Sequence, residues 1–351
     1  MTAFKKFAAA LCVLFVVTLF FACSKKAPGG DERTLIQVRD YAERIVAIEK
    51  PAKRLVVMAD NALVVVKQLQ AVETVVALDS KTKGFLPLSI LKDINPTLLD
   101  IPDVGKTKSP NYEQIIELNP DLILLKGNKE SADMMQEKTN VPVACVISKD
   151  GYDFDLYLIV GKLLGKEKEA AGLVNLFETH KMNIEKIVSS IEESKKKSAY
   201  IVVQNSKNNF FKTQKGSLSL ELAGLKNVAA NANKVDQWGF AELSKEAFID
   251  YNPSLIFLDK PYSESGIHKD DLMADPTFLF SDAVKKQRIF YTHSFALPKD
   301  YVYVIAEAYY YANTAYPNIV TEDVYKNAIN EIFKAAYGID NYYETWKKSL
   351  L

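Results

Sequence analysis

Residues 112–125 read Tyr-Glu-Gln-Ile-Ile-Glu-Leu-Asn-Pro-Asp-Leu-Ile-Leu-Leu, and residues 245–258 read Lys-Glu-Ala-Phe-Ile-Asp-Tyr-Asn-Pro-Ser-Leu-Ile-Phe-Leu. In both stretches a glutamate is followed six residues later by Asn-Pro and then by an apolar run. Because proline ends a helix and strands of parallel sheets are continuously apolar, each stretch predicts a short helix that leads into a parallel strand. Two copies in one chain predict two similar α/β lobes.

Short apolar runs alternate with amphipathic patterns along the rest of the chain, which is typical of α/β units. We expect strands at residues 54–58, 74–78, 122–125, 141–147, 199–203, 255–258 and 288–291. Residues 34–38 and 44–48 predict a small hairpin. The expected fold class is therefore α/β, with a central, mostly parallel sheet in each lobe.

One long helix is expected to join the lobes. Residues 167–194 lack proline and carry an apolar stripe with steps of 4, 3, 4, 3 and 4 residues: Leu173, Phe177, His180, Ile184, Ile187 and Ile191. At 1.5 Å per residue the helix would be roughly 40 Å long. The stripe also places His180 on the packed face. A coiled coil is the weaker alternative, because the pattern covers at most about three heptads.

Length and composition indicate a globular protein. The chain has 351 residues, enough for two ordinary domains, and 48% of them are hydrophobic. Its 44 basic residues balance its 44 acidic residues, and it has only 14 glycines and 13 prolines. This composition excludes a disordered chain, a collagen and a polybasic nucleic-acid binder, so no nucleic-acid partner is expected.

Residues 1–22 have the pattern of a secretory signal peptide. Lys5 and Lys6 precede an apolar run over residues 7–22, which is shorter than the ~20 residues that a membrane span needs. Residues 19–23 (Leu-Phe-Phe-Ala-Cys) resemble a bacterial lipobox, which implies lipidation of Cys23; an ordinary signal peptide with an incidental cysteine is the alternative. We expect an exported protein, anchored by lipid to the outer face of the cytoplasmic membrane or in the periplasm.

Cleavage would give the mature chain a net charge of 42 − 44 = −2 and would remove Cys12. Cys145 would then remain alone beside the lipidated Cys23, so no internal disulfide is expected. After the tether over residues 23–33, we expect an N-terminal lobe over 34–150, a linker helix region over 151–196 and a C-terminal lobe over 197–351.

The order and spacing of several segments resemble the substrate-binding lipoproteins of ABC importers for iron–siderophore, haem and cobalamin. Besides the first repeat, the resemblance rests on residues 34–51 (with Glu43 where glycine is usual), Lys53-Arg-Leu-Val-Val57, Val104-Gly105, Ser109-Pro110, Gly161-Lys-Leu-Leu-Gly165, Ala296-Leu-Pro298 and Tyr316-Pro317. It covers roughly residues 34–320. It implies a ligand held in a cleft between two helix-linked lobes and delivery to an ABC permease with its ATPase. The expected ligand is an iron chelate, a ferric siderophore first, with haem and cobalamin as alternatives.

The resemblance assigns permease docking to one acidic residue in each lobe, and the matching positions are Glu113 and Glu246. The alternative is that each carboxylate only complements the dipole in the first turn of its helix, worth ~0.3–1 kcal/mol. Ser109 with Pro110 predicts the start of the first helix, and Ser244 predicts the cap of the second. Placement at the same point of both repeats favours docking.

The ligand is expected at the carboxyl ends of the strands. In the first lobe four lysines follow predicted strands and suit an anionic chelate: Lys81, Lys83, Lys106 and Lys126. In the second lobe the candidates are mainly aromatic and suit a flat chelate: Trp238, Tyr262, Tyr291, His293 and Tyr301. Each lysine taken singly also fits a solvated surface charge.

No metal ligand is certain and no resident cofactor is expected. His293 or Tyr291 would be the axial ligand if the cargo were haem, although a single histidine after a strand more often serves as a hydrogen-bonded loop residue. At Tyr309-Tyr-Tyr311, at least one ring is expected to be core.

An enzyme is disfavoured. Gly105-Lys-Thr107 resembles the end of a P-loop, but Asp100 stands where that motif needs glycine, and neither a Gly-x-Ser-x-Gly nor a His-Glu-x-x-His pattern occurs. A surface lipoprotein that binds a protein partner is the remaining alternative, and it would need exposed apolar patches.

Overall fold

The computed structural model describes residues 35–147, 154–204, 209–232, 235–236, 239–261, 266–293 and 300–351. The signal peptide, Cys23 and the tether predicted from the sequence lie outside these residues. None of the described helices is both long and apolar enough to cross a membrane.

The first lobe is built on a four-stranded parallel sheet in the order β4 (Val75–Leu78), β3 (Leu55–Met58), β7 (Leu122–Leu125) and β8 (Val143–Cys145). Every residue of β3, β7 and β8 is buried, as expected for parallel strands covered on both faces. The predicted hairpin is confirmed as β1 (Ile36–Arg39) and β2 (Ile45–Ile48). The helices of this lobe are α1 (Asp60–Gln68), α2 (Ser80–Phe85), α3 (Leu91–Ile94), α4 (Tyr112–Glu117), α5 (Lys129–Thr139) and α6 (Asp155–Leu164).

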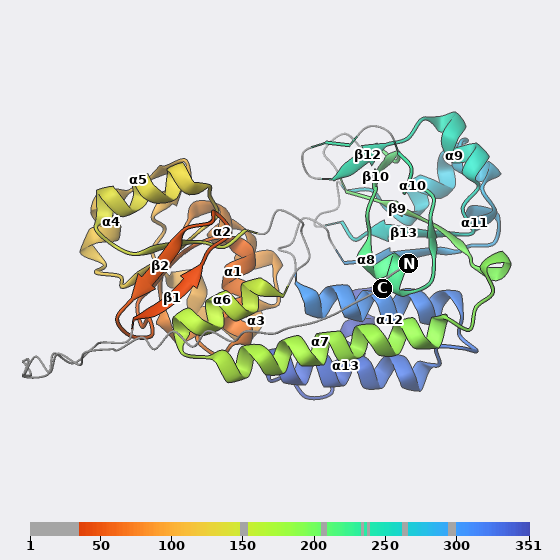
Figure 1. Ribbon diagram of the computed structural model, residues 1–351. Coiled ribbons are helices and arrows are strands. Elements are labelled where there is room, and N and C mark those ends of the chain that lie inside the picture. The colour runs from red at the N-terminus through yellow and green to blue at the C-terminus, as the bar shows by residue number, and fades with distance from the viewer. Residues whose placement is uncertain are drawn as a thin grey trace, which may run out of the picture. The chain divides into compact units, whose positions relative to one another are not determined.

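The second lobe repeats this plan. Its parallel sheet has the order β11 (Lys226–Asn227), β9 (Ser198–Val202), β13 (Leu255–Asp259) and β14 (Ile289–Thr292). In both sheets the first strand of the chain lies between the second and the third. The smaller elements are a hairpin of β10 (Lys212–Gln214) and β12 (Phe240–Glu242) in this lobe and one of β5 (Gly105–Lys106) and β6 (Ser109–Pro110) in the first. The predicted α/β fold with two parallel-sheet lobes is confirmed (Figure 1).

The helices of the second half are α8 (Leu218–Leu222), α9 (Lys245–Tyr251), α10 (Lys269–Ala274), α11 (Asp282–Lys285), α12 (Tyr301–Ala315), α13 (Glu322–Tyr337) and α14 (Tyr343–Ser349). Short 3-10 turns cover Val72–Thr74, Leu86–Leu88, Pro96–Asp100, Glu193–Lys195 and Phe278–Phe280.

The two sequence repeats have the same local structure. Helices α4 and α9 lead into β7 and β13, and Asn119 and Asn252 after these helices have φ of 48° and 37°. Asparagine tolerates this left-handed conformation better than most residues, which explains its place before the proline. Ser244 caps α9 as predicted, since its side chain accepts from the backbone N–H of Ala247 at 3.1 Å.

The predicted start of the first repeat helix is wrong. The side chain of Asn111 caps α4 by accepting from the backbone N–H of Gln114 at 3.2 Å. Ser109 and Pro110 instead form β6 and pair with β5.

The long helix is α7, Glu167–Val188, which has 22 residues and therefore spans about 33 Å. It ends six residues before the predicted end at Ser194. Ser189 and Ser190 after its end donate their hydroxyls to the carbonyls of Lys186 and Ile187, a local pairing that competes with a continued helix.

The predicted packing of His180 is confirmed. The residue is buried on α7, and its Nδ1 lies 3.3 Å from the Tyr309 hydroxyl. Tyr309 and Tyr311 are themselves buried, as predicted for at least one ring of that cluster.

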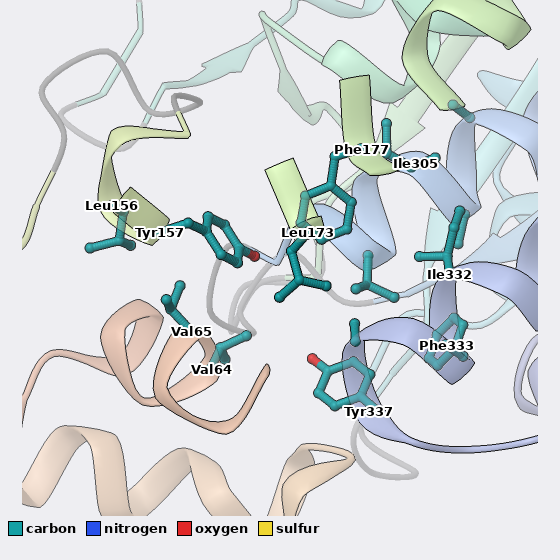
Figure 2. Packing of buried hydrophobic residues seen from close by; sticks show 14 of the residues in the cluster. Val64, Val65, Leu156, Tyr157, Leu173, Phe177, Ile305, Ile332, Phe333 and Tyr337 are labelled. Carbon is teal, nitrogen blue, oxygen red and sulfur yellow. The ribbon is translucent and has the colours of Figure 1, made fainter. Parts of the chain in front are cut away.

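One apolar cluster contains side chains from both halves of the chain (Figure 2). Val64 and Val65 of α1 and Tyr157 of α6 belong to it, together with Phe177 of α7 and Phe333 of α13. Helix α7 lies along α12 and α13 (Figure 1). Each large apolar side chain buried in this way stabilises the fold by about 1.5–3 kcal/mol.

Candidate functional site

Three charged side chains meet at the carboxyl edge of the first sheet. Asp60 follows β3, Lys81 follows β4 and Lys126 follows β7 directly. Nζ of Lys81 lies 3.0 Å from Oδ2 of Asp60, and Nζ of Lys126 lies 3.8 Å from Oδ1. Two of the predicted lysines are therefore brought together around one carboxylate. Asp60 belongs to a strand-end loop expected to touch the ligand, but it was not one of the predicted ligand-binding residues.

Asp60 is almost completely buried, and burial by itself would raise its pKa. The charges of Lys126 and Lys81, with hydrogen bonds from Lys81 and the backbone of Asn61, outweigh burial and hold the pKa below its usual value. Asp60 is therefore ionised at neutral pH. With two ammonium groups around one carboxylate, this cluster has a net charge of +1.

Asn61 adds an amide to the same edge. Its Nδ2 donates to the carbonyl of Val146 at 3.2 Å, just beyond β8. Its Oδ1 is buried and has no hydrogen-bond partner among the residues that the structure describes. A buried acceptor without a partner is destabilising, so this oxygen is suited to receive a donor from a ligand or from water.

The other two predicted lysines do not join this cluster. Nζ of Lys83 donates to the carbonyl of Ile101 at 2.6 Å, and Lys106 is exposed on β5. Residues 80–83 form the first turn of α2, which Asp79 caps by accepting from the backbone N–H of Thr82 at 3.2 Å. The cap turns Lys81 toward Asp60 and Lys83 toward a different partner.

Among the predicted residues of the second lobe, Trp238 and Tyr262 lie outside the described residues. Tyr291 is half-buried on β14, and Nζ of Lys269 lies 4.3 Å from its ring centroid. Tyr301 begins α12, and its ring centroid lies 4.6 Å from that of Phe154. Tyr301 therefore contributes to an aromatic cluster beside α6 and α7.

His293 follows β14 and lies against the C-terminal helices. Its ring centroid is 4.1 Å from that of Trp346, and its Nε2 is 2.9 Å from the hydroxyl of Ser349. Burial and the charge of Lys260 lower its pKa to about 3, so the imidazole is neutral at physiological pH. These contacts favour a structural role for His293.

Glu307 of α12 is a buried carboxyl that was not among the predicted site residues. Its Oε1 accepts from the Thr292 hydroxyl at 2.6 Å and from the backbone N–H of His293 at 3.2 Å. Burial raises the pKa of Glu307 to about 7. The sequence feature that could have identified it is its place as the one acidic residue of an otherwise largely apolar helix.

Glu113 and Glu246 are exposed in the first turns of α4 and α9. Hydrogen bonds from its own backbone N–H and from the Ser244 hydroxyl lower the pKa of Glu246, so this carboxylate is charged at neutral pH. The two glutamates occupy equivalent positions in the two lobes.

Cys145 is buried at the end of β8, and burial raises its pKa to about 11. Within the described ranges, no group of three or more His, Cys, Asp and Glu side chains is placed to hold a metal ion.

The described residues thus form two similar parallel-sheet lobes joined by one long helix. The model of the periplasmic binding protein family matches residues 55–296, which is most of the chain. The chain therefore belongs to this family, the extracytoplasmic solute-binding proteins that partner with ABC permeases.

The chain is 24% identical over 307 residues to the iron-uptake system-binding protein of Bacillus subtilis, covering 82% of this chain and 90% of that protein. A periplasmic solute-binding protein of Veillonella parvula superposes with a TM-score of 0.73 at 17% identity, covering 88% of this chain and 94% of that one. The molybdate-binding periplasmic protein of Haemophilus influenzae superposes with a TM-score of 0.71 at 18% identity, covering 87% and 98%. These two structures show the shared fold.

Proposed function

We propose that this protein captures a ferric chelate, most simply a ferric siderophore, and delivers it unchanged to its ABC permease. The observation that carries the proposal is the pair of ammonium groups of Lys81 and Lys126 at the carboxyl edge of the first sheet. The relative named for iron uptake supports iron as the cargo. Ferric catecholate and citrate chelates are anionic, and charge-assisted hydrogen bonds to such oxygens are roughly twice as strong as neutral ones.

Asp60 is part of this proposed site because it positions both lysines. An isolated pair of ammonium groups would repel each other, and the buried carboxylate between them offsets that repulsion. The Lys81 side chain is about half exposed and that of Lys126 about one-third exposed, so both are partly accessible to solvent. The residual charge of the cluster is positive, which selects against cationic ligands.

We further propose that an aromatic surface of the second lobe completes the site. Tyr291 would lie at the carboxyl end of β14, and Trp238, Tyr262 and Tyr301 remain candidates from the sequence. In the same account Lys106 approaches the ligand from the β5–β6 hairpin. Cys23 carries the lipid that tethers the protein after cleavage of residues 1–22.

Docking is proposed to use Glu113 and Glu246, each paired with a basic side chain of the permease. The test is charge reversal of both residues, Glu113→Lys with Glu246→Lys, in cells whose only copy of this protein is the variant. Uptake of radioactive iron supplied as the chelate should be lost, while the purified variant should bind the chelate as tightly as the wild type.

Glu137→Lys with Glu221→Lys is the matched control, since it reverses one exposed carboxylate in each lobe outside the two repeat helices. Equal loss of uptake in the control, or weaker chelate binding in the docking variant, would contradict the assignment of Glu113 and Glu246.

A further inference from the structure

The two repeats share more than their glutamates. Ile115 of α4 and Phe248 of α9 occupy equivalent positions and are buried in the cores of their lobes. The next residue in each copy, Ile116 or Ile249, is 49% or 45% exposed. Each repeat helix therefore buries one large apolar side chain and presents another to solvent.

The exposed isoleucine shares a helix face with two carboxylates. Residues three and four apart are neighbours on a helix surface. Ile116 and Glu117 of α4 are therefore both neighbours of Glu113. In α9 the same spacing joins Glu246, Ile249 and Asp250. All of these acidic residues are exposed. We call each set an acid–isoleucine triad.

Single exposed apolar side chains are common on protein surfaces and need no explanation. Here, however, the same side chain is exposed at the same point of both lobes, each time beside carboxylates. Burying it is not required for the local fold, since Ile115 and Phe248 already anchor the two helices.

Two aromatic side chains close in sequence to the second-lobe repeat are also exposed. Tyr251, at the end of α9, is 42% exposed, and Phe280 is 66% exposed. The two segments are tied together because the backbone N–H of Asp282 donates to Oδ1 of Asn252 at 2.8 Å. The two lobes thus offer the same central triad, with additional aromatic surface on the second.

We infer that the two acid–isoleucine triads are the contact surfaces for the permease, with each isoleucine entering an apolar pocket flanked by basic side chains. Family membership supplies the partner, and the ionised Glu246 supplies charge complementarity to a basic surface. Two equivalent triads suit a partner that offers two equivalent binding surfaces. The inference rests on the proposed docking and adds an apolar anchor to it, the kind of buried centre that dominates interface affinity.

The test measures binding of the purified protein to its permease–ATPase complex, isolated from the same organism and held in lipid nanodiscs. Ile116→Gln and Ile249→Gln should each weaken permease binding about tenfold, and the double variant should weaken it further. Leu158→Gln on α6 and Met182→Gln on α7 are the controls, because these side chains are 45% and 60% exposed on helices outside the repeats.

Chelate affinity, measured on the same samples, should remain that of the wild type for all five variants. Permease binding of the double isoleucine variant within twofold of wild type would overturn the inference. If charge reversal at Glu113 and Glu246 still abolished binding in that case, the proposed docking would stand without the apolar anchor. If substitution of neither the two isoleucines nor the two glutamates weakened permease binding, the docking proposal itself would be wrong.

Discussion

The side chain of Gln68 at the end of α1 donates a hydrogen bond to Oδ1 of Asp300, just before α12, over 2.9 Å. Gln68 also donates to the hydroxyl of Tyr337 on α13 and accepts from that of Tyr157 on α6. Tyr337 donates to the second oxygen of Asp300. This buried network connects helices of the first lobe to the C-terminal helices, beside the cluster in Figure 2.

Replacing Gln68 by leucine, which conserves volume, should destabilise the protein by about 1–3 kcal/mol, because it leaves the buried Asp300 and Tyr157 without their partner. Tyr157→Phe removes a single hydroxyl from the same network and should cost less. Urea denaturation of both variants measures the effect. Unchanged stability of Gln68→Leu would show that the network does not hold the two lobes together.

The proposed ligand cluster makes a second prediction. Lys81→Met and Lys126→Met should each weaken binding of an anionic ferric chelate about tenfold or more, since a hydrogen bond to a charged group is worth about 1.5–3 kcal/mol. Lys53→Met is the matched control, because Lys53 precedes β3 at the opposite edge of the same sheet. Calorimetric titration measures the affinities. Equal affinities for all three variants would show that Lys81 and Lys126 do not bind the chelate.

A third prediction concerns stability against pH. Burial raises the pKa of Glu307 from 4.5 to about 7, so the folded protein holds a proton there that the unfolded chain has released. Glu307 therefore lowers stability as pH rises from about 4.5 to about 7. The lowered pKa of His293, about 3 against 6.5, acts in the opposite direction over pH 3 to 6.5. The two trends offset each other between about pH 4.5 and 6.5.

Glu307→Gln removes the first trend only. The variant should therefore gain stability relative to wild type as pH rises from 5 to 8, by up to about 1.4 kcal/mol per pH unit below pH 7. Urea denaturation at each pH measures the difference. Glu344→Gln, an exposed carboxyl of α14, controls for the loss of one charge. A difference that does not change with pH would show that Glu307 is ionised throughout.

The sequence predicted those parts of the fold that depend on short segments. Continuous apolar runs identified the parallel strands, the Asn-Pro repeats identified the duplicated lobe, and the stripe from Leu173 to Ile184 identified α7. The predictions for the end of α7 and the cap of α4 were wrong because local hydrogen bonds decide both. Ser189 and Ser190 donate to carbonyls of the last turn of α7, and Asn111 accepts from the backbone of α4. Other polar residues nearby could have formed similar bonds.

The candidate site was only partly predictable. Their positions after predicted strands identified Lys81 and Lys126 as candidates. The sequence does not show that both side chains contact Asp60 while Lys83 bonds to the carbonyl of Ile101. Gln68 and Asp300 are 232 residues apart, so no local pattern links them. Their partnership, like the burial of Glu307, depends on tertiary packing.

The central claim is that this protein binds a ferric chelate, and the most direct test is a titration of the chain lacking residues 1–23. Quenching of its two tryptophans, Trp238 and Trp346, would be followed with ferric catecholate, hydroxamate and citrate chelates, and with haemin, cobalamin and molybdate. The account predicts saturable binding of one ferric chelate class at micromolar or lower concentration, weakened by Lys81→Met. Binding of haemin, cobalamin or molybdate alone, or of none of these compounds, would contradict it.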